Sequence, residues 1–306
     1  MEQQKLNVME IERFAVQDGP GIRTTMFLKG CAMHCPWCAN PESQPAAPVL
    51  LHDAGKCLRC GGCAACCPVG AVRWQPAQLP VFDRARCTAC GVCCARCPGG
   101  ALELCGRQMS AQEIAKIVLR DRDYYRDSGG GVTFSGGEAL LQAPALAPLL
   151  ALLRAQGVAL AVETCGQFLP QALKTVQAAG GFDLFLFDVK HADPKTLARV
   201  TGGDAGQIIA NLDAAVQSGA RVIARVPVIP GFNHDRGAMA QIFRLCAAHG
   251  VREADLLPYH TLGRGKYARL GRSYDWPGAM LQREDLQPWA ALAAEYGVRA
   301  RIGGGD

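Results

Sequence analysis

The sequence predicts an α/β protein with a largely parallel sheet, either open or closed into a barrel. From Ser110 onward, short apolar stretches alternate with longer Ala- and Leu-rich stretches that have helical spacing, and this alternation is typical of parallel sheets with crossover helices. Polar residues follow several of the apolar stretches, which is where α/β folds usually build their sites. One further apolar stretch, at 24–28, adds a sixth strand.

The individual elements follow from these patterns. Ser110 and Glu113 have the spacing of a capping box, so a helix is expected to begin directly after Ser110. Other helices are expected near 144–156, 169–179, 207–218, 236–249 and 284–296. Strands are expected at 24–28, 131–134, 158–162, 183–187, 221–228 and 254–257.

Composition excludes several classes of protein. Hydrophobic residues make up 49% of the 306 positions and charged residues 19%, so a sizeable core is expected and wholesale disorder is not. The net charge of +5 comes without a basic block, which argues against a nucleic-acid partner. Residues 1–10 lack a secretory pattern and no run of eighteen apolar residues occurs. We therefore expect no membrane association and a cytoplasmic location.

The sixteen cysteines need a metal-based explanation. Thirteen of them lie between Cys31 and Cys97, and closely spaced thiols in a reducing compartment favour metal binding over disulfides. Cys31, Cys35 and Cys38 form a C-x3-C-x2-C loop. Three thiolates hold three irons of a [4Fe–4S] cluster and leave the fourth iron open to a ligand. Structural zinc, with His34 as a fourth ligand, is the alternative.

A duplicated motif, C-x2-C-x2-C-x3-C-P, occupies 57–68 and recurs thirty positions later at 87–98. In two-cluster ferredoxins the fourth cysteine of each run binds the other cluster. That rule assigns one [4Fe–4S] cluster to Cys57, Cys60, Cys63 and Cys97, and another to Cys87, Cys90, Cys93 and Cys67. Two zinc sites are the alternative. Three further cysteines in or just after the duplicated region, which fall outside its motif, are expected to be small buried residues, namely Cys66, Cys94 and Cys105.

Charge in the duplicated region is consistent with a redox partner. Between His52 and Cys105 there are six Lys or Arg residues and three acidic residues, which gives a net charge of +3. An acidic electron donor such as flavodoxin or ferredoxin would suit this surface, although solvated surface charge explains it equally well. The insert is expected either to relay electrons or to shape a docking surface.

The three-cysteine loop resembles the cluster motif of the radical S-adenosylmethionine superfamily. The stretch from Asp18-Gly-Pro-Gly-Ile-Arg23 to Cys31, with Cys38-Ala-Asn-Pro-Glu42, resembles glycyl-radical-enzyme activating enzymes such as pyruvate formate-lyase activase. The resemblance implies a partial (β/α)6 barrel. It also implies an oxidoreductase that reductively cleaves S-adenosylmethionine. The resulting 5′-deoxyadenosyl radical would take a hydrogen atom from a glycine of a partner enzyme in anaerobic metabolism.

The resemblance also implies roles for individual residues. Cys31, Cys35 and Cys38 would hold the catalytic cluster, and Lys190 would neutralise the carboxylate of S-adenosylmethionine. Glu163, Thr164 and Asp188 would hold a monovalent cation. The remaining cosubstrate contacts would come from Trp37, Gly136, Gly137, Glu138 and His260. The partner's glycine loop would meet Asp18, Gly19, Gly21 and Arg23, for which a structural turn is the rival interpretation.

Three segments follow from these assignments. Residues 1–51 would form the first part of the barrel, 52–106 a ferredoxin-like insert and 107–306 the rest of the barrel. We expect a monomer with three clusters. Two rivals are a radical enzyme that acts on a small molecule and an electron-transfer iron–sulfur protein. The second rival leaves the three-cysteine loop unexplained.

Overall fold

The central sheet has nine strands within residues 4–304, which are the residues that the computed structural model describes. Its order is β13-β12-β11-β10-β9-β8-β2-β1-β7, so the sheet is open, with β13 and β7 at its edges. The strands are β1 (Leu6–Ala15), β2 (Arg23–Leu28), β7 (Arg107–Met109), β8 (Gly131–Gly136), β9 (Ala159–Thr164), β10 (Leu184–Asp188), β11 (Arg221–Val228), β12 (Glu253–Pro258) and β13 (Arg299–Ile302).

From β2 to β13 all neighbouring strands are parallel, whereas β1 pairs antiparallel with β2 and with β7. The six predicted strands are all present, with ends within two residues of the expected ones. The three strands that sequence analysis missed are β1, β7 and β13, which lie at the sheet's two ends. Strands in such positions keep one polar face, so their apolar signal is weak.

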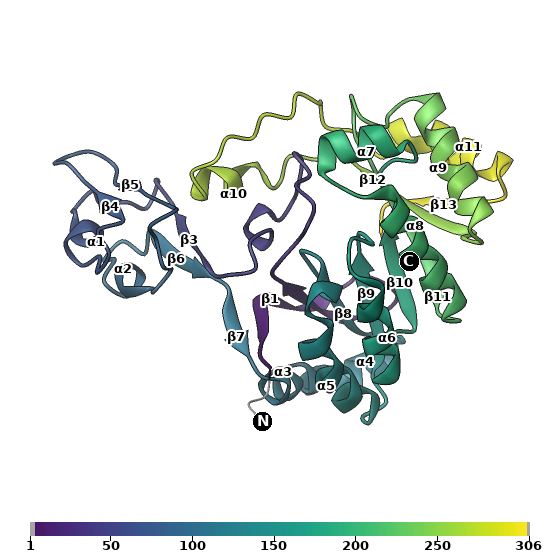
Figure 1. The fold of residues 1–306 in the computed structure, drawn as a ribbon, viewed down its shortest axis with the longest axis horizontal. Coiled ribbons are helices and arrows are strands. Elements are labelled where there is room, and N and C mark those ends of the chain that lie inside the picture. The colour runs from purple at the N-terminus through teal and green to yellow at the C-terminus, as the bar shows by residue number, and fades with distance from the viewer. Residues whose placement is uncertain (1–3, 305–306) are drawn as a thin grey trace.

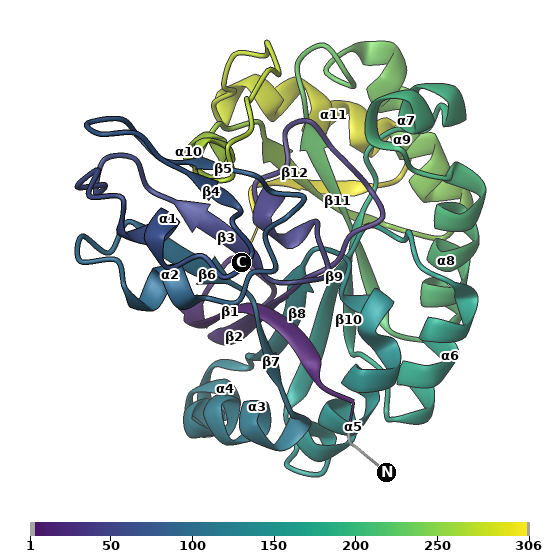
Figure 2. The same ribbon diagram turned by 60° about the vertical axis from the view of Figure 1, so that its left-hand side comes forward.

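Helices connect the parallel strands and lie along the sheet (Figures 1 and 2). The capping box is confirmed: the Glu113 backbone N–H donates to Ser110 Oγ over 3.2 Å, and the Ser110 N–H donates to the Glu113 carboxylate over 2.7 Å. The helices outside the insert are α3 (Ala111–Val118), α4 (Arg122–Ser128), α5 (Ala143–Arg154), α6 (Pro170–Ala178), α7 (Pro194–Thr201), α8 (Ala205–Gln217), α9 (Arg236–Ala248), α10 (Arg264–Arg269) and α11 (Gln287–Glu295).

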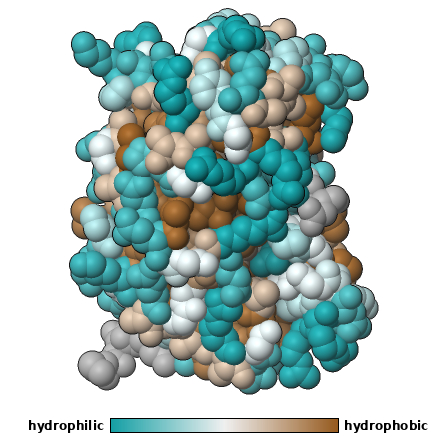
Figure 3. Space-filling view, turned by 90° about the vertical axis from the view of Figure 1, so that its right-hand side faces the viewer, coloured by the Kyte–Doolittle hydropathy of each residue, from teal (hydrophilic) through white to brown (hydrophobic). Residues whose placement is uncertain are grey.

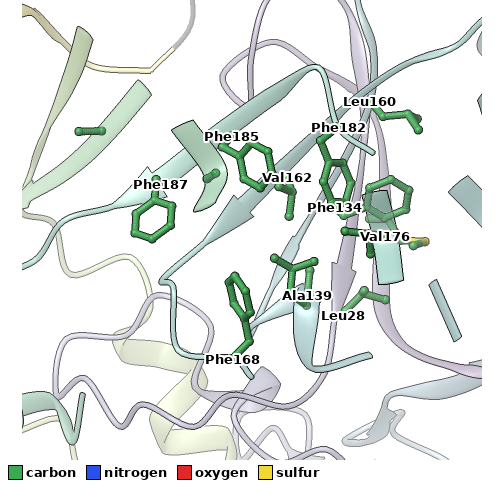
Figure 4. Packing of buried hydrophobic residues seen from close by; sticks show 14 of the residues in the cluster. Leu28, Phe134, Ala139, Leu160, Val162, Phe168, Val176, Phe182, Phe185 and Phe187 are labelled. Carbon is green, nitrogen blue, oxygen red and sulfur yellow. The ribbon is translucent and has the colours of Figure 1, made fainter. Parts of the chain in front are cut away.

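The main hydrophobic core lies between the sheet and these helices (Figure 4). Phe134 on β8 and Phe185 on β10 both pack against Phe182, with ring centroids 6.0 and 5.6 Å apart. Burial of each such side chain stabilises the fold by roughly 1.5–3 kcal/mol. The core thus fixes the strand ends on which the site is built. On the face seen in Figure 3, hydrophobic residues gather near the middle among hydrophilic ones.

The cysteine-rich segment forms a separate lobe beside the sheet (Figure 1). Its elements are β3 (Val49–His52), α1 (Gly62–Ala65), β4 (Val72–Arg73), β5 (Val81–Phe82), α2 (Val92–Ala95) and β6 (Leu102–Cys105). The duplication is visible in its backbone, because the Asp53 N–H donates to the Ala101 carbonyl and the Asp83 N–H to the Ala71 carbonyl, each over 2.8 Å. Each half of the lobe therefore closes against the other half.

The lobe attaches to α10 and has only a small hydrophobic cluster at this junction. That cluster contains Leu51, Cys105 and Leu270. Glu103 pairs with Arg269 over 2.5 Å, and Arg84 donates to the Arg269 carbonyl over 3.3 Å. So little apolar burial is not sufficient to stabilise a unit of this size. Nowhere in residues 4–304 is a helix both long and apolar enough to cross a membrane.

Candidate active site

A cavity of about 1220 Å³ opens at the carboxyl ends of the parallel strands. Strands β8 to β12 all contribute to its lining, and so does the three-cysteine loop that follows β2. The cavity is lined by eight of the predicted cosubstrate and cation residues and by two of the predicted cluster cysteines. These ten residues are Cys35, Trp37, Cys38, Gly136, Gly137, Glu163, Thr164, Asp188, Lys190 and His260.

Backbone hydrogen bonds hold the three-cysteine loop against the turn that follows it. The Gly30 N–H donates to the Ser43 carbonyl over 2.7 Å, and the Cys31 N–H donates to the Gln44 carbonyl over 3.0 Å. Within the loop, the Cys38 N–H donates to the Cys35 carbonyl over 3.1 Å. These contacts fix all three thiols near one end of the cavity.

The thiols of this loop lie in a setting that suits metal-bound thiolates. Burial raises the pKa of Cys35 to about 12 and that of Cys38 to about 11. For Cys31, a hydrogen bond with the Cys165 thiol is the main cause of a lowered pKa. Buried thiolates are costly unless a cation compensates them, and iron provides that compensation. The three thiols therefore fit a cluster that faces the cavity.

Close backbone approach explains Gly136 and Gly137 at the end of β8. A Cβ on Gly136, which has φ +108°, would lie 2.3 Å from the Leu28 carbonyl oxygen, and one on Gly137 would lie 2.2 Å from that of Gly30. Only glycine fits such contacts. The Gly137 N–H donates to the Leu28 carbonyl over 2.8 Å. The two glycines thus fasten the three-cysteine loop to β8 and leave backbone on the cavity wall.

Glu138 is fully buried and is not among the residues that line the cavity, so its contact with the cosubstrate stays a prediction. Glu138 Oε2 accepts hydrogen bonds from Thr164 Oγ1 over 2.7 Å and from the Cys165 N–H over 2.9 Å. Burial raises the pKa of Glu138, and these hydrogen bonds oppose that shift. Glu138 therefore positions the end of β9.

Two acid–base pairs line the cavity. Lys190 Nζ donates to Asp188 Oδ2 over 2.6 Å, and Arg225 pairs with Glu163. Burial alone would lower the pKa of Lys190, but the Asp188 carboxylate and neighbouring thiols outweigh burial and raise it. Lys190 is therefore cationic at neutral pH.

Sequence analysis missed Arg225, which lies in the middle of β11 and lines the cavity. The available signal was an arginine in the interior of a strand that is otherwise apolar after its first residue, Arg221. A charged side chain on a buried strand usually has a buried partner, and here the partner is Glu163.

Aromatic and imidazole side chains form another part of the lining. Trp37 is 8% exposed and packs on Phe232 and Trp276, with ring centroids 4.6 and 4.9 Å apart. His260 follows β12 at the cavity rim, and burial lowers its pKa. Both predicted residues therefore line the cavity, Trp37 rigidly and His260 as a neutral imidazole at pH 7.

Asp18 and Arg23 of the predicted partner-binding segment have different surroundings. Asp18 lines the cavity, where its Oδ2 accepts a hydrogen bond from Thr25 Oγ1 over 2.6 Å. Arg23 is only 2% exposed, and its guanidinium donates to Thr133 Oγ1 and to the Val132 carbonyl. The guanidinium therefore supports the segment from beneath, and a contact between Arg23 and a partner stays a prediction.

The glycines of the same segment are needed by its own turn. Gly19 and Gly21 have φ values of +117° and +69°, which favour glycine. A Cβ on Gly21 would come within 2.5 Å of the Gly130 backbone nitrogen. The turn interpretation thus explains both glycines, and their contact with a partner stays a prediction.

Two smaller cavities in the insert divide its cysteines in the crossed pattern of the ferredoxin rule. One, of about 390 Å³, is lined by Cys57, Cys60, Cys63 and Cys97. The other, of about 350 Å³, is lined by Cys67, Cys87, Cys90 and Cys93. Within residues 4–304, no three His, Cys, Asp or Glu side chains converge tightly enough for a single metal ion.

Backbone N–H groups already point at one thiol of each set. The Ala71 N–H donates to Cys67 Sγ over 3.2 Å and the Ala101 N–H to Cys97 Sγ over 3.3 Å. Such hydrogen bonds stabilise thiolates and tune iron–sulfur clusters. The surroundings of both sets therefore fit [4Fe–4S] clusters.

The open parallel sheet and the three-cysteine loop at its carboxyl edge define a radical S-adenosylmethionine enzyme, and the Radical SAM superfamily model matches residues 86–242. One solved structure with the same fold is that of Streptococcus suis SuiB bound to S-adenosylmethionine. It has 13% identity and a TM-score of 0.50, and the match covers 65% of this chain and 44% of that one.

Similar curated proteins identify the family within the radical S-adenosylmethionine superfamily. Benzylsuccinate synthase activating enzyme from Thauera aromatica is 40% identical over 97% of this chain and 92% of its own length. Choline trimethylamine-lyase activating enzyme from Oleidesulfovibrio alaskensis is 36% identical over 97% of both chains. The protein belongs to the family of glycyl-radical-enzyme activating enzymes. Its activity is reductive cleavage of S-adenosylmethionine and generation of a glycyl radical on a partner enzyme.

Proposed function

We propose that the chain works with three [4Fe–4S] clusters: a catalytic cluster on Cys31, Cys35 and Cys38, and two clusters in the insert. The observation that best supports the catalytic assignment is the convergence of this loop with the polar strand ends on one cavity of about 1220 Å³. The insert assignment is supported by the two cavities that divide eight cysteines into crossed sets of four.

The chain's own residues bind and orient S-adenosylmethionine in this proposal. The cationic Lys190 attracts the carboxylate of the cosubstrate, and the backbone at Gly136 and Gly137 accepts its amino group. Trp37 and His260 limit where the rest of the cosubstrate lies. When bound, the open cluster and S-adenosylmethionine supply one electron and a 5′-deoxyadenosyl radical, and the protein supplies orientation and electrostatics.

We place the predicted monovalent cation beside Thr164 and Asp188. Asp188 keeps a second carboxylate oxygen beside its contact with Lys190. Glu163 contributes less to such a site, because the guanidinium of Arg225 already neutralises its charge.

The partner is proposed to insert its glycine-bearing loop beside Asp18. Asp18 lines the cavity, and the segment 16–22 runs over residues 128–130, where Gly21 packs. Asp18 carries a free carboxylate oxygen toward backbone N–H groups of an incoming loop. The partial (β/α)6 barrel of residues 1–51 and 107–306 leaves one side open for that loop, because the edges β7 and β13 do not pair.

The ferredoxin-like insert of residues 52–106 is proposed to receive electrons from flavodoxin or ferredoxin in the cytoplasm. Its net charge of +3 favours acidic donors through electrostatic steering. A monomer suffices for these steps, since one chain provides the cavity and all eleven cluster cysteines.

A test of this function uses the reconstituted protein, S-adenosylmethionine, a reductant and a glycyl-radical enzyme encoded beside it. We expect 5′-deoxyadenosine to form in proportion to a glycyl doublet in the electron paramagnetic resonance spectrum. Cosubstrate cleavage without a doublet on a competent partner would favour the small-molecule rival. Spectra that ignore S-adenosylmethionine would overturn the catalytic assignment.

A further inference from the structure

The two halves of the insert are not equivalent around their cysteines. The thirty-residue offset relates His52 to Phe82, Arg59 to Ala89 and Arg96 to Cys66. In each of the three pairs one residue has a nitrogen-bearing side chain, and all three of these side chains line the same cavity. His52, Arg59 and Arg96 line the cavity of Cys57, Cys60, Cys63 and Cys97.

The other cavity has no charged or imidazole side chain in its lining. Besides Cys67, Cys87, Cys90 and Cys93, it is lined by Leu50, Pro68, Val69, Val72, Thr88, Ala89 and Gly91. The two predicted cluster sites thus have the same thiol number and similar volumes, but different surroundings.

His52 is the residue of this set that is held in place. Its ring packs on Phe82, with centroids 5.1 Å apart and planes at 51°. Its Nε2 atom is buried, and no other described residue hydrogen-bonds to it. A buried polar atom without a partner is energetically unfavourable, so its presence on the wall of a cluster cavity points to a ligand there.

Burial, followed by the nearby Arg84 guanidinium, lowers the pKa of His52. The imidazole is therefore neutral at pH 7 and has one N–H to donate. Arg84 itself is directed elsewhere, since it donates to the Leu50 carbonyl.

We propose that His52 donates an Nε2–H hydrogen bond to a sulfur of the cluster on Cys57, Cys60, Cys63 and Cys97, and so makes that cluster the more easily reduced of the insert pair. This inference rests on the proposed function, in which both cavities hold clusters. Hydrogen bonds to cluster sulfurs and nearby positive charge stabilise the reduced form, which is more negative. Arg59 and Arg96 act in the same direction.

The position of the His52 cavity in the lobe indicates what the difference in reduction potential does. His52 pairs with Leu102 at the far end of the β3–β6 ladder, whereas Val49 pairs with Cys105 at the end that joins the barrel. In Figure 1, α1 lies farther from the sheet than α2. The cluster near His52 is therefore the outer one, which takes the electron from the flavodoxin or ferredoxin donor and holds it before transferring it to the inner cluster.

The experiment measures the potentials of both insert clusters in the full chain. A Cys35→Ala background removes the catalytic cluster, so about eight irons per chain should remain. We expect His52→Phe to weaken reduction of one insert cluster about tenfold, a shift of about 59 mV for one electron, and to leave the other cluster unchanged. Potentiometric titration followed by electron paramagnetic resonance provides the readout.

Phe82→Leu is the matched control, because it changes the same ring contact and keeps the imidazole. We expect no shift for this variant. If His52→Phe loses the cluster, His52→Gln keeps an N–H donor and should retain most of the wild-type potential. An unchanged potential in His52→Phe, or equal shifts in His52→Phe and Phe82→Leu, would overturn the proposal. Iron content near zero in the Cys35→Ala background would instead overturn the insert clusters themselves.

Discussion

The cavity of the barrel and the cavities of the insert use the same thiol chemistry in opposite ways. The insert surrounds each cavity of about 350–390 Å³ with four cysteines. The barrel places Cys35 and Cys38 of its three-cysteine loop on the wall of a cavity of about 1220 Å³ that is also lined by acids and bases. A closed ligand set suits electron transfer, and an open one suits chemistry on a bound molecule. Ligand number and free space, rather than cysteine content, separate the two functions.

Loss of a ligand from the open site should have the largest effect. We expect Cys35→Ala to abolish formation of 5′-deoxyadenosine while about eight irons per chain remain in the insert. Cys246→Ala is the matched control, because Cys246 is fully buried in α9 and lines none of the three cavities. Retained cleavage in Cys35→Ala would show that the chemistry lies elsewhere.

Removal of iron should destabilise the insert much more than the barrel. The barrel has an extensive core of its own, whereas the lobe shares a cluster of three buried residues with α10. We expect chelation to make residues 52–106 sensitive to limited proteolysis while the barrel resists. Mass spectrometry of the fragments locates the cuts. Early cuts within β8 to β12 would contradict this expectation.

Neutralising a base in the open cavity should weaken cosubstrate binding without affecting the insert. Lys190→Gln removes a buried cation that faces Asp188. Loss of a charge-assisted hydrogen bond, worth about 1.5–3 kcal/mol, corresponds to roughly a tenfold to hundredfold weaker affinity for S-adenosylmethionine. Equilibrium binding measures this effect, and Lys195→Gln, an exposed lysine on α7, should leave the affinity unchanged.

The smallest expected effect concerns an ion pair at the sheet edge that serves neither site. Hydrogen bonds from Arg221 and Arg299 hold the pKa of Glu253 at about 2. A lowered carboxyl pKa stabilises the fold above the unfolded pKa of about 4.5, and this stability is lost as pH falls through about 2. Glu253→Gln should therefore cost about 1 kcal/mol at pH 7 and almost nothing near pH 2.

Urea unfolding of the iron-free barrel provides this measurement at both pH values. Glu295→Gln, whose exposed side chain lies 3.6 Å from Arg236, is the control and should change stability little at either pH. A cost for Glu253→Gln that is equally large at pH 2 would show that packing, not charge, is responsible.

Local patterns were sufficient to predict most of the fold. The six parallel strands and the capping box at Ser110 appear where apolar runs and cap residues indicated them. The strands at the two ends of the sheet, β1, β7 and β13, were not predicted. Apolar and polar residues alternate in half-exposed strands, so such strands have no continuous apolar run. Helix α7 (Pro194–Thr201) also escaped, although Asp193 is its N-cap, because a segment of eight residues provides little periodicity.

Individual side-chain roles were less predictable than the site's location. Glu138 and Arg23 belong to the right motifs, but burial turns both toward the protein interior. Arg225 belongs to no motif, and only its pairing with Glu163 across two strands brings it into the cavity. A motif specifies which residues are near a site, but the direction of each side chain depends on contacts from distant parts of the chain.

The sequence by itself determined the α/β class, the three-cysteine loop, the duplicated cysteine runs and the resemblance to activating enzymes. These are properties of spacing along the chain, and they need no long-range information. Tertiary structure alone decided which acids are already neutralised and which half of the insert bears His52 on its cavity wall. The physical reason is that electrostatics and desolvation depend on distances in space, which only the packed core sets.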